Sequence, residues 1–455
     1  MFRPKNAEEI TEVFALARRE GLTVTLRGGG NSYGDAAINQ EGIALDLTEM
    51  DRILAWDRDT GIVETEPGVT LQKLWQTIIP DGYWPPVVSG TMYTTVGGCA
   101  AMNIHGKNNF IAGPFGNHVL DFDLLTPSGD VLTCSREENP ELFHAAISGF
   151  GMLGCFIRIR MQMKQVHSGL IRVETVRTHS LGEMADEFEN RAVDADYLVG
   201  WVDCIAGGKS LGRGIVHQAK YLPPGLDPRP SDSLTVAAQE LPSNFFGVVP
   251  KSLMYLALSP LVNNLGMRLI NSAKYHGARL QPLGHTYFES HAGFAFLLDY
   301  VPNWKWAYKP GGLIQYQCFL PKEKAVAAFE KIIEASKRAG LPSYLGVFKK
   351  HRPDPFLMTH SLDGYSLALD YRITQKNRQS VWALTGAFDK IVLDNGGRFY
   401  FAKDATLRPD SISEFFPEEN LQNFVALKDQ CDPENLLQTD LSRRLFPDYF
   451  GSARE

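Results

Sequence analysis

The 455-residue chain carries 45 Lys and Arg residues against 52 Asp and Glu residues, a formal net charge of −7. With 44% hydrophobic residues it has the apolar material for two or three folded domains, which excludes a disordered or fibrous protein. The charge provides no basic footprint for nucleic acid and no polybasic membrane tether. Glycine is the one excess: 19 of its 41 residues lie within the first 155 positions.

The six cysteines are scattered, with no C-x-x-C pair and no histidine at metal-ligand spacing beside them. We therefore expect neither a disulfide framework nor a metal site. The first six residues contain no apolar signal region, and the longest uncharged apolar stretch, 252–267, is too short to span a bilayer. These features predict a cytoplasmic protein with no signal peptide and no transmembrane helix.

The first third of the chain alternates short strands and helices with glycine-rich loops. Asn6 caps a helix that ends at Gly21, and Thr70 caps a second helix whose apolar residues lie on one face. Strands are predicted at 22–26, 42–47, 61–66, 119–126, 131–134 and 155–163. The glycine-rich segments between them are 27–35, 90–98 and 113–118.

The composition changes near residue 164, after which glycine thins and aromatic, strand-like alternations dominate. Four strands and two helices are predicted in this part: 197–202, 313–320, 344–348, 366–371, 323–339 and 379–395. We expect an α+β protein with a first domain over 1–165, a second sheet-plus-helix domain over 166–397, and a helical tail over 398–455. The tail is expected to return to the first domain.

The three glycine-rich loops present many backbone N–H groups without side-chain obstruction, as a diphosphate requires. Gly28-Gly29-Gly30 follows a strand but matches neither the G-x-G-x-x-G nor the G-x-x-x-x-G-K-[ST] fingerprint. A Rossmann or P-loop site is therefore disfavoured. Each loop alone is more often a simple turn, whereas three in series favour a dinucleotide.

The order of these segments resembles the FAD-binding domain of the vanillyl-alcohol oxidase superfamily, the PCMH-type FAD domain. The segments that carry this resemblance are 27–35, 66–69, 90–91 and 95–98. The whole chain is further similar to the decaprenylphosphoryl-ribose 2′-oxidases of mycobacterial arabinan synthesis, a cell-wall pathway. This second likeness is carried by 103–108, 115–119, 123–126, 315–317, 347–349, 400–404 and 440–445.

The resemblance implies bound FAD, with backbone groups of the first two loops at its pyrophosphate and later residues along the ring, ribityl and adenosine path. The cofactor-binding residues that it implies are Arg27, Gly28, Gly29, Gly30, Asn31, Ser32, Tyr33, Gly90, Thr95, Val96, Gly97, Gly98, Asn103, His105, Gly106, Gly116, Asn117, His118, Phe156 and Tyr400. In many relatives a His or Cys bonds covalently to the flavin. Asn31 and Tyr93 hold those two positions here, so we expect non-covalent FAD.

Oxidation of a secondary alcohol requires its C–H hydride to face flavin N5 while another group takes the hydroxyl proton. The resemblance places Lys403 beside that hydroxyl, where a lowered pKa would let its amine accept the proton. His105 is the competing base. The structural alternatives are a surface Lys403-Asp404 ion pair and a loop histidine that caps a backbone group.

The resemblance also implies a substrate pocket lined by Tyr33, Lys107, Trp201, Gln315, Gln317, Lys349, Ser366 and Lys403. Gln315 and Gln317 share one face of a predicted strand, and Tyr316 points to the other face. The basic run 349–352 is expected to meet a substrate phosphate, or else to be a solvated loop. The mycobacterial oxidases carry Asn and Cys where Ser366 and Ala368 stand, and Arg at Asn31, which leaves the sugar and its lipid carrier open.

These implications together favour FAD-dependent oxidation of a sugar hydroxyl to a ketone, at C2 of a polyprenyl-phosphate-linked pentose, as the first half of an epimerisation. An NAD(P)H-dependent short-chain reductase would be the pathway partner, and oxygen or a quinone the electron acceptor. The alternatives are a soluble alditol or aldonolactone oxidase and an inactive flavin-binding subunit. The stretch 245–275, rich in Leu, Met and Phe, is either a membrane-facing or lipid-tail lid, with peripheral inner-membrane contact, or a buried helix pair.

Overall fold

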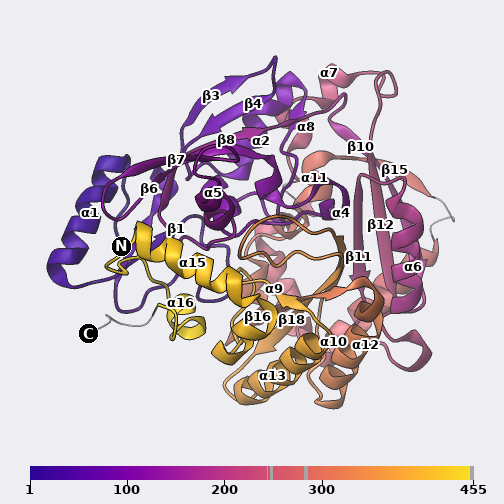
Figure 1. The fold of residues 1–455 in the computed structure, drawn as a ribbon. Coiled ribbons are helices and arrows are strands. Elements are labelled where there is room, and N and C mark those ends of the chain that lie inside the picture. The colour runs from indigo at the N-terminus through magenta and orange to yellow at the C-terminus, as the bar shows by residue number, and fades with distance from the viewer. Residues whose placement is uncertain (243, 246–248, 281–284, 451–455) are drawn as a thin grey trace.

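The computed structural model describes residues 1–242, 244–245, 249–280 and 285–450. Two antiparallel sheets dominate it, one of five strands and one of eight, with helices around them (Figure 1). The fold is therefore α+β, as the sequence predicts. Residues 246–248 of the stretch 245–275, and residues 451–455 of the predicted tail, lie outside the described residues.

The N-terminal part forms the five-stranded sheet, a parallel pair β1-β2, and short helices. Asn6 accepts a hydrogen bond from Glu9 N–H and Thr70 one from Lys73 N–H, so both predicted helix caps are confirmed. The elements are α1 (Ala7–Glu20), β1 (Val24–Arg27), β2 (Ile43–Asp46), β3 (Ile53–Asp57), β4 (Ile62–Thr65), α2 (Leu71–Ile78), β5 (Tyr83–Trp84), α3 (Val96–Ala101), α4 (Asn109–Ala112), β6 (Val119–Leu125), β7 (Val131–Ser135), α5 (Pro140–Ala146), β8 (Cys155–Gln162) and β9 (Lys164–Gln165).

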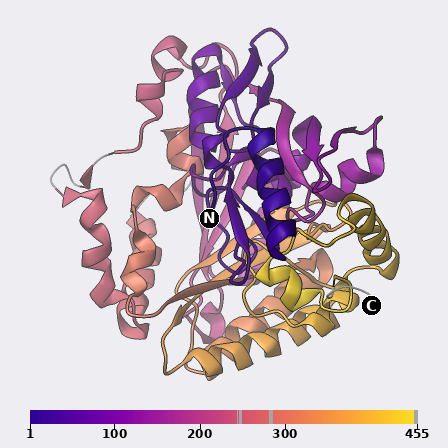
Figure 2. The same cartoon turned by 90° about the vertical axis from the view of Figure 1, so that its left-hand side faces the viewer.

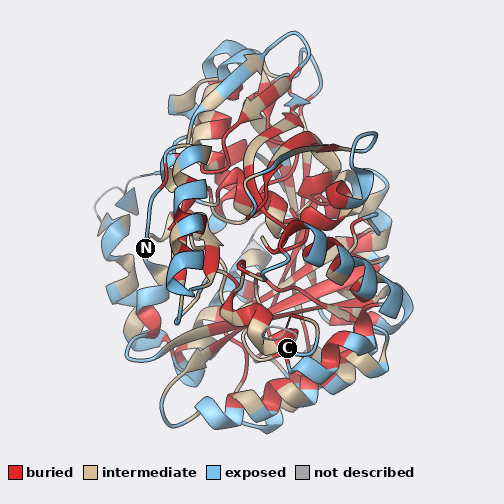
Figure 3. Cartoon of the chain, turned by 60° about the vertical axis from the view of Figure 1, so that its left-hand side comes forward, coloured by how far each residue is buried: buried red, intermediate tan, exposed pale blue. Residues whose placement is uncertain are grey.

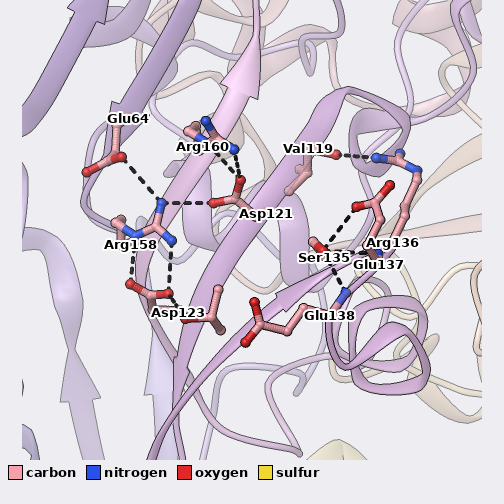
Figure 4. Close-up of polar contacts among 11 residues, drawn as sticks. Glu64, Val119, Asp121, Asp123, Ser135, Arg136, Glu137, Glu138, Arg158 and Arg160 are labelled. Carbon is pink, nitrogen blue, oxygen red and sulfur yellow. Dashed lines mark hydrogen bonds and ion pairs between the residues drawn. The ribbon is translucent and has the colours of Figure 1, made fainter.

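An ion-pair network joins the middle strands of the five-stranded sheet, whose order is β3-β4-β8-β6-β7 (Figure 4). Arg158 of β8 donates two hydrogen bonds to Asp123 at 2.6 and 2.9 Å and one to Asp121 at 2.9 Å, both on β6. It also reaches Glu64 of β4 at 3.3 Å. Because the guanidinium is planar with fixed donors, one side chain fixes the register of three strands.

The second part forms the eight-stranded sheet, with strand order β15-β10-β12-β11-β17-β18-β16-β19. Its strands β10, β12 and β15 were not predicted. The elements are β10 (Leu170–Thr178), α6 (Leu181–Ala192), β11 (Tyr197–Val202), β12 (Gly214–Tyr221), α7 (Pro230–Ser233), α8 (Val236–Gln239), β13 (Asn244–Phe245), β14 (Val249–Pro250), α9 (Met254–Leu258), α10 (Asn264–Gly277), β15 (Thr286–Ser290), α11 (His291–Ala295), β16 (Gly312–Pro321), α12 (Lys322–Arg338), β17 (Gly346–His351), β18 (Gly364–Ile373), α13 (Arg378–Asp394) and β19 (Arg398–Phe399).

Helices α6, α12 and α13 pack on one face of this sheet and leave the other face toward the N-terminal part (Figure 1). Side chains alternate between the two faces because successive strand residues point in opposite directions. Phe348 packs against Phe188 of α6, and Tyr316 donates a hydrogen bond of 3.0 Å to Asp389 of α13. The strand residues beside them, among them Gln315 and Gln317, therefore face away from the helices.

One continuous hydrophobic core runs through both sheets and the C-terminal helices α14 (Ile412–Phe415), α15 (Glu418–Cys431) and α16 (Asp440–Leu445). Buried residues accordingly lie along the middle of the molecule, between the layers (Figure 3). The tail also returns to the N-terminus, where Val24 N–H donates to the Leu436 carbonyl at 2.8 Å. The domain limits at 165 and 397 stay a prediction.

Helices α12 and α13 have 17 residues each. Within the described ranges, no helix combines the length and the apolar character that a membrane-spanning helix needs. All six cysteines are buried and free.

Candidate functional site

A cavity of about 1230 Å³ lies between the N-terminal part and the open face of the eight-stranded sheet. The glycine-rich loops 27–33 and 90–98 line one end, and strands β11, β16 and β17 line the other. Pockets for one small ligand usually measure about 300–1,000 Å³. The cavity therefore has room for a large cofactor together with a substrate.

The first glycine loop presents a backbone surface to the cavity. Within the described part of the chain, the N–H groups of residues 29–32 bond to no protein acceptor. Gly30 has a φ of +62°, and a Cβ on Gly28 would overlap the Thr95 hydroxyl. Unpaired amides beside glycines that allow close approach fit the diphosphate of FAD, which such backbone concavities bind.

The second loop differs from the prediction. Residues 96–101 form the short helix α3, with Thr95 as its cap. The Val96 and Gly97 N–H groups donate to the Val69 and Pro67 carbonyls, both at 2.8 Å, and Gly98 N–H donates to the Thr95 hydroxyl. These three amides are already engaged, unlike the unpaired amides of the first loop.

Asn31 and Tyr93 hold the two positions at which many relatives attach the flavin covalently. Here a hydrogen bond joins the two residues. The Asn31 amide donates to the Tyr93 carbonyl at 2.9 Å and to the Gly29 carbonyl at 3.1 Å. The cavity is lined by His105 and His217, and by no cysteine among the described residues. Burial raises the pKa of the Cys99 thiol to about 12, which removes its nucleophilic thiolate.

The first loop is clamped to the segment after β19. Tyr33 N–H donates to the Ala402 carbonyl at 2.8 Å, and a Cβ on Gly34 would overlap the Asp404 carbonyl. Arg444 of the tail donates to both oxygens of Asp35, at 2.7 and 2.8 Å, and to Asp404 at 2.7 Å. We name Asp35, Asp404 and Arg444 the loop clamp; sequence reasoning did not find it as a unit.

Tyr33 lies between two lysines at the middle of the cavity. The Lys403 ammonium is 3.7 Å from the centre of its ring, and the Lys305 ammonium is 4.4 Å away. Burial lowers the pKa of Lys403 to about 7, against the opposing attraction of the Asp370 carboxylate. Because Asp404 pairs with Arg444 and Lys403 lines the cavity, the alternative of a surface Lys403-Asp404 ion pair is wrong.

The His105 imidazole is buried, and both of its ring nitrogens face nitrogen atoms of other side chains. Its Nε2 lies 3.0 Å from Gln317 Nε2, and its Nδ1 lies 3.4 Å from Lys349 Nζ. Burial, together with the charges of Lys349 and other nearby cationic groups, holds the pKa of His105 well below its usual value. It contacts side chains rather than capping the backbone. A histidine whose pKa is lowered in this way is a weaker proton acceptor than a histidine in water.

The two glutamines lie on the cavity face of β16, as predicted, and Tyr316 lies on the helix face. Gln315 donates to Asp370 at 2.5 Å, and Gln317 reaches the Ser366 hydroxyl at 3.4 Å. One oxygen of Asp370 has no hydrogen-bond partner among the described residues. Asp370 therefore supplies a buried negative charge behind the lysines, a role that sequence reasoning missed.

The basic run 349–352 does not form one phosphate-binding cluster, and that expectation is wrong. Strand alternation turns Lys349 to the cavity but brings Lys350 to Glu189 of α6, at 2.5 Å. His351 is buried 2.7 Å from the Ser366 hydroxyl. Arg352 is likewise absent from the described cavity wall.

Several predicted residues stand behind the wall rather than on it. Asn103 accepts a hydrogen bond from Gly116 N–H at 2.9 Å, and His118 Nε2 lies 3.1 Å from the Ala112 carbonyl, so these side chains hold loop backbone. The predicted cofactor and substrate residues that do not line the cavity are Val96, Asn103, Gly106, Gly116, Asn117, His118 and Ser366. The predicted residues that line it are Arg27, Gly28, Gly29, Gly30, Asn31, Ser32, Tyr33, Gly90, Thr95, Gly97, Gly98, His105, Lys107, Phe156, Trp201, Gln315, Gln317, Lys349, Tyr400 and Lys403.

Other lining residues come from segments with no sequence motif. Asp299 accepts hydrogen bonds from the Thr91 hydroxyl and Met92 N–H, at 2.7 and 2.8 Å, and so fixes the second loop. The Lys274 ammonium of α10 lies 4.5 Å from the Trp201 ring centre. Lys305, His217, Glu289 and Tyr300 join them. No local signal could have selected these residues, because only the fold brings them to one cavity.

The comparisons with known proteins agree with this geometry. Residues 1–135 match the FAD binding domain family. Decaprenylphosphoryl-β-D-ribose oxidase of Mycolicibacterium smegmatis is 30% identical over 440 residues, which cover 96% of this chain and 92% of that protein. The chain belongs to the vanillyl-alcohol oxidase superfamily of PCMH-type FAD-binding proteins. It is an FAD-dependent oxidoreductase that acts on CH–OH groups.

More distant members of this superfamily share only part of the chain. L-gulonolactone oxidase of Bos taurus is 29% identical over 198 residues, 43% of this chain and 44% of that protein. Cytokinin dehydrogenase 2 of Oryza sativa subsp. japonica is 27% identical over 218 residues, 46% of this chain and 39% of that protein. The similarity to the mycobacterial oxidase, by contrast, extends through the substrate half of the cavity.

The pair Asn31 and Tyr93 carries a prediction about FAD attachment. Asn31 carries an amide and Tyr93 a phenol, whereas a covalent bond to the flavin requires an imidazole or a thiolate. We therefore expect acid precipitation to release all the FAD. The measurement is flavin absorbance in the supernatant and in the washed, redissolved pellet. Flavin that stays with the pellet after denaturation would contradict non-covalent binding.

Proposed function

We propose that this protein oxidises a hydroxyl of a phosphate-linked sugar to a ketone, at C2 of a polyprenyl-phosphate-linked pentose. The observation that carries the proposal is the charge of the cavity. Among the residues that the structure describes, five lysines line it, Lys107, Lys274, Lys305, Lys349 and Lys403, against two carboxylates, Glu289 and Asp299. In a chain of net charge −7, such a concentration of cations favours an anionic substrate.

The pKa values of these lysines support the same conclusion. Burial lowers the pKa of Lys107 to about 7 and that of Lys349 to about 8. Desolvated ammonium groups that crowd together are unstable without a counter-ion, and a phosphodiester would restore their charge through charge-assisted hydrogen bonds. A neutral lactone or alditol would bring no such negative charge. This difference favours a phosphate-linked sugar over the substrates of a soluble alditol or aldonolactone oxidase.

In the proposed reaction the sugar carbon loses a hydride and its hydroxyl loses a proton. FAD bound at the glycine loops supplies the hydride acceptor. Lys403, neutral above pH 7, takes the proton, and Tyr33 fixes the position of its amine. Neutral His105 and the amides of Gln315 and Gln317 offer hydrogen-bonding groups to the other hydroxyls on this side of the cavity.

The proposal extends to partners. A ketone formed at C2 would be consumed by an NAD(P)H-dependent short-chain reductase, which completes an epimerisation, and the reduced flavin would pass its electrons to oxygen or a quinone. A lipid-linked substrate implies peripheral contact with the cytoplasmic face of the inner membrane. Similarity to the mycobacterial oxidase over 96% of the chain supports these assignments.

The test is anaerobic bleaching of the flavin absorbance by a panel of free sugars, aldonolactones, sugar phosphates and polyprenyl-phosphoryl pentoses. We expect rapid bleaching with the lipid-linked pentose and slower bleaching with its short-chain analogue. Faster bleaching by an uncharged sugar or lactone would select the aldonolactone oxidase alternative. Protein that binds FAD but is reduced by no member of the panel would favour the inactive flavin-binding subunit.

A further inference from the structure

The segment 249–280 has an unusual combination of charge and exposed apolar surface. It contains four lysine and arginine residues and no aspartate or glutamate, although the chain as a whole is acidic. Its helices α9 and α10 stand at the left-hand edge of the molecule in Figure 2. The expectation that 245–275 forms an ordinary buried helix pair is wrong, because leucines on both helices are exposed.

The exposed leucines follow helical spacing. On α10, Leu265 and Leu269 lie one turn apart and are 68% and 62% exposed, while Asn271 and Tyr275 are buried. On the neighbouring elements, Leu253, Leu256, Leu261 and Trp306 are also exposed. One exposed leucine needs no explanation, whereas a group on connected elements indicates an interaction surface.

These elements form one platform. The short helix Trp304–Tyr308 packs on α9 and on the short helix Ser259–Leu261, which contacts both α9 and α10. Their inner side chains, among them Leu258, Val262 and Tyr308, share a small hydrophobic cluster. The exposed leucines and Trp306 therefore lie on a layer of short helices that this hydrophobic cluster holds together. We name Leu253, Leu256, Leu261, Leu265, Leu269 and Trp306 the leucine face.

The positive charges near the leucine face indicate which kind of partner binds there. Lys251, Arg268 and Arg279 lie on the same segment, and the Lys309 ammonium lies 4.6 Å from the centre of the Trp306 ring. Leucines with a tryptophan among lysines and arginines, on short helices, are typical of surfaces that lie in the interface of an anionic bilayer.

We propose that the leucine face docks on an anionic membrane surface and presents the cavity to a lipid-linked substrate. Trp304, Lys305 and Trp306 line the cavity as well as belonging to the platform, and Lys274 reaches it from α10. The cavity and the leucine face are thus adjacent. A polyprenyl chain could stay in the bilayer while its sugar phosphate enters. This proposal rests on the proposed function, because it assumes that the substrate is linked to a lipid.

The test is flotation of the holoprotein, without substrate, with vesicles of phosphatidylcholine alone or mixed with phosphatidylglycerol. We expect binding to the anionic vesicles that high salt weakens. Leu265→Gln combined with Leu269→Gln should reduce partition more than about tenfold. Arg268→Gln should reduce it about fivefold. The matched control is Val193→Gln with Leu226→Gln, two exposed apolar residues beside a separate hollow that contains Asp194 and Asp196, which should leave partition unchanged.

Each outcome decides the proposal. Absence of binding to anionic vesicles, equal loss in the control, or lipid-free self-association that the leucine variants abolish would overturn it. Flavin reduction by substrate dispersed in detergent is measured in parallel and should be the same in the leucine variants and the wild type. If vesicles bind but no lipid-linked sugar bleaches the flavin, the membrane surface stands and the proposed substrate fails; the reverse result overturns the surface alone.

Discussion

Lys403→Ala is expected to retain FAD and to lower the rate of flavin reduction by substrate about 10³-fold, the usual range for a lost general base. The physical reason is the position of its amine, 3.7 Å from the Tyr33 ring centre inside a buried cavity. Burial lowers the pKa of Lys403 to about 7, so a fraction of neutral amine is available near neutral pH. Anaerobic stopped-flow absorbance measures the rate.

The assignment of Lys403 as the base also predicts in which direction the rate of flavin reduction changes with pH. A base must be unprotonated to act, so the reduction rate should rise with pH through about 7 and level off above it. Lys403→Ala should remove this rise. Lys305→Ala is the matched comparison, because it removes the other ammonium over the Tyr33 ring. It should keep the rise with pH but move it to higher pH, since the charge of Lys305 helps to lower the pKa of Lys403. A full reduction rate in Lys403→Ala would refute the assignment, and an unchanged profile in a slow variant would return the base to His105.

Arg444→Met is expected to destabilise the protein by about 2–3 kcal/mol and to weaken FAD binding. The substitution leaves Asp35 and Asp404 without their shared cation, and both side chains are mostly shielded from solvent. Repulsion between the two carboxylates would then open the contact between the first glycine loop and residues 402–404. Urea denaturation measures the stability, and recovery of flavin fluorescence on dilution measures FAD release.

The control for Arg444→Met is Arg408→Met. Arg408 pairs with Asp410 at 2.7 Å on the surface, where both side chains are more than half exposed, and such pairs contribute little. It should change neither the urea midpoint nor FAD release. If Arg444→Met behaves like this control, the loop clamp is an incidental ion pair and Lys403 is positioned by other contacts.

Much of the local structure could be predicted because it depends on neighbours in the sequence. The caps Asn6 and Thr70, the strand 197–202, and the opposite directions of Gln315 and Tyr316 are confirmed. Strand β12 could not be predicted from its own residues, which include His217, Gln218 and Lys220. It is a strand because β10 and β11 pair with it on both sides.

In the candidate site, too, some features follow from the local sequence and others only from the fold. The free amides of the first loop follow from its glycines, whereas the amides of Val96 and Gly97 are engaged by carbonyls about thirty residues earlier in the chain. The basic run 349–352 suggested one cluster, but a strand turns successive side chains to opposite faces, and only Lys349 reaches the cavity.

The sequence by itself therefore determined the helix caps, the glycine loop fitted to a diphosphate and the superfamily, because these depend on backbone geometry over a few residues. Only the tertiary structure decided the charge of the cavity, the pKa of Lys403 and the leucine face. Lys107, Lys274, Lys305, Lys349 and Lys403 are far apart in the chain, yet they line one cavity. Burial and Coulomb interactions depend on distance in space, which the order of residues does not encode locally.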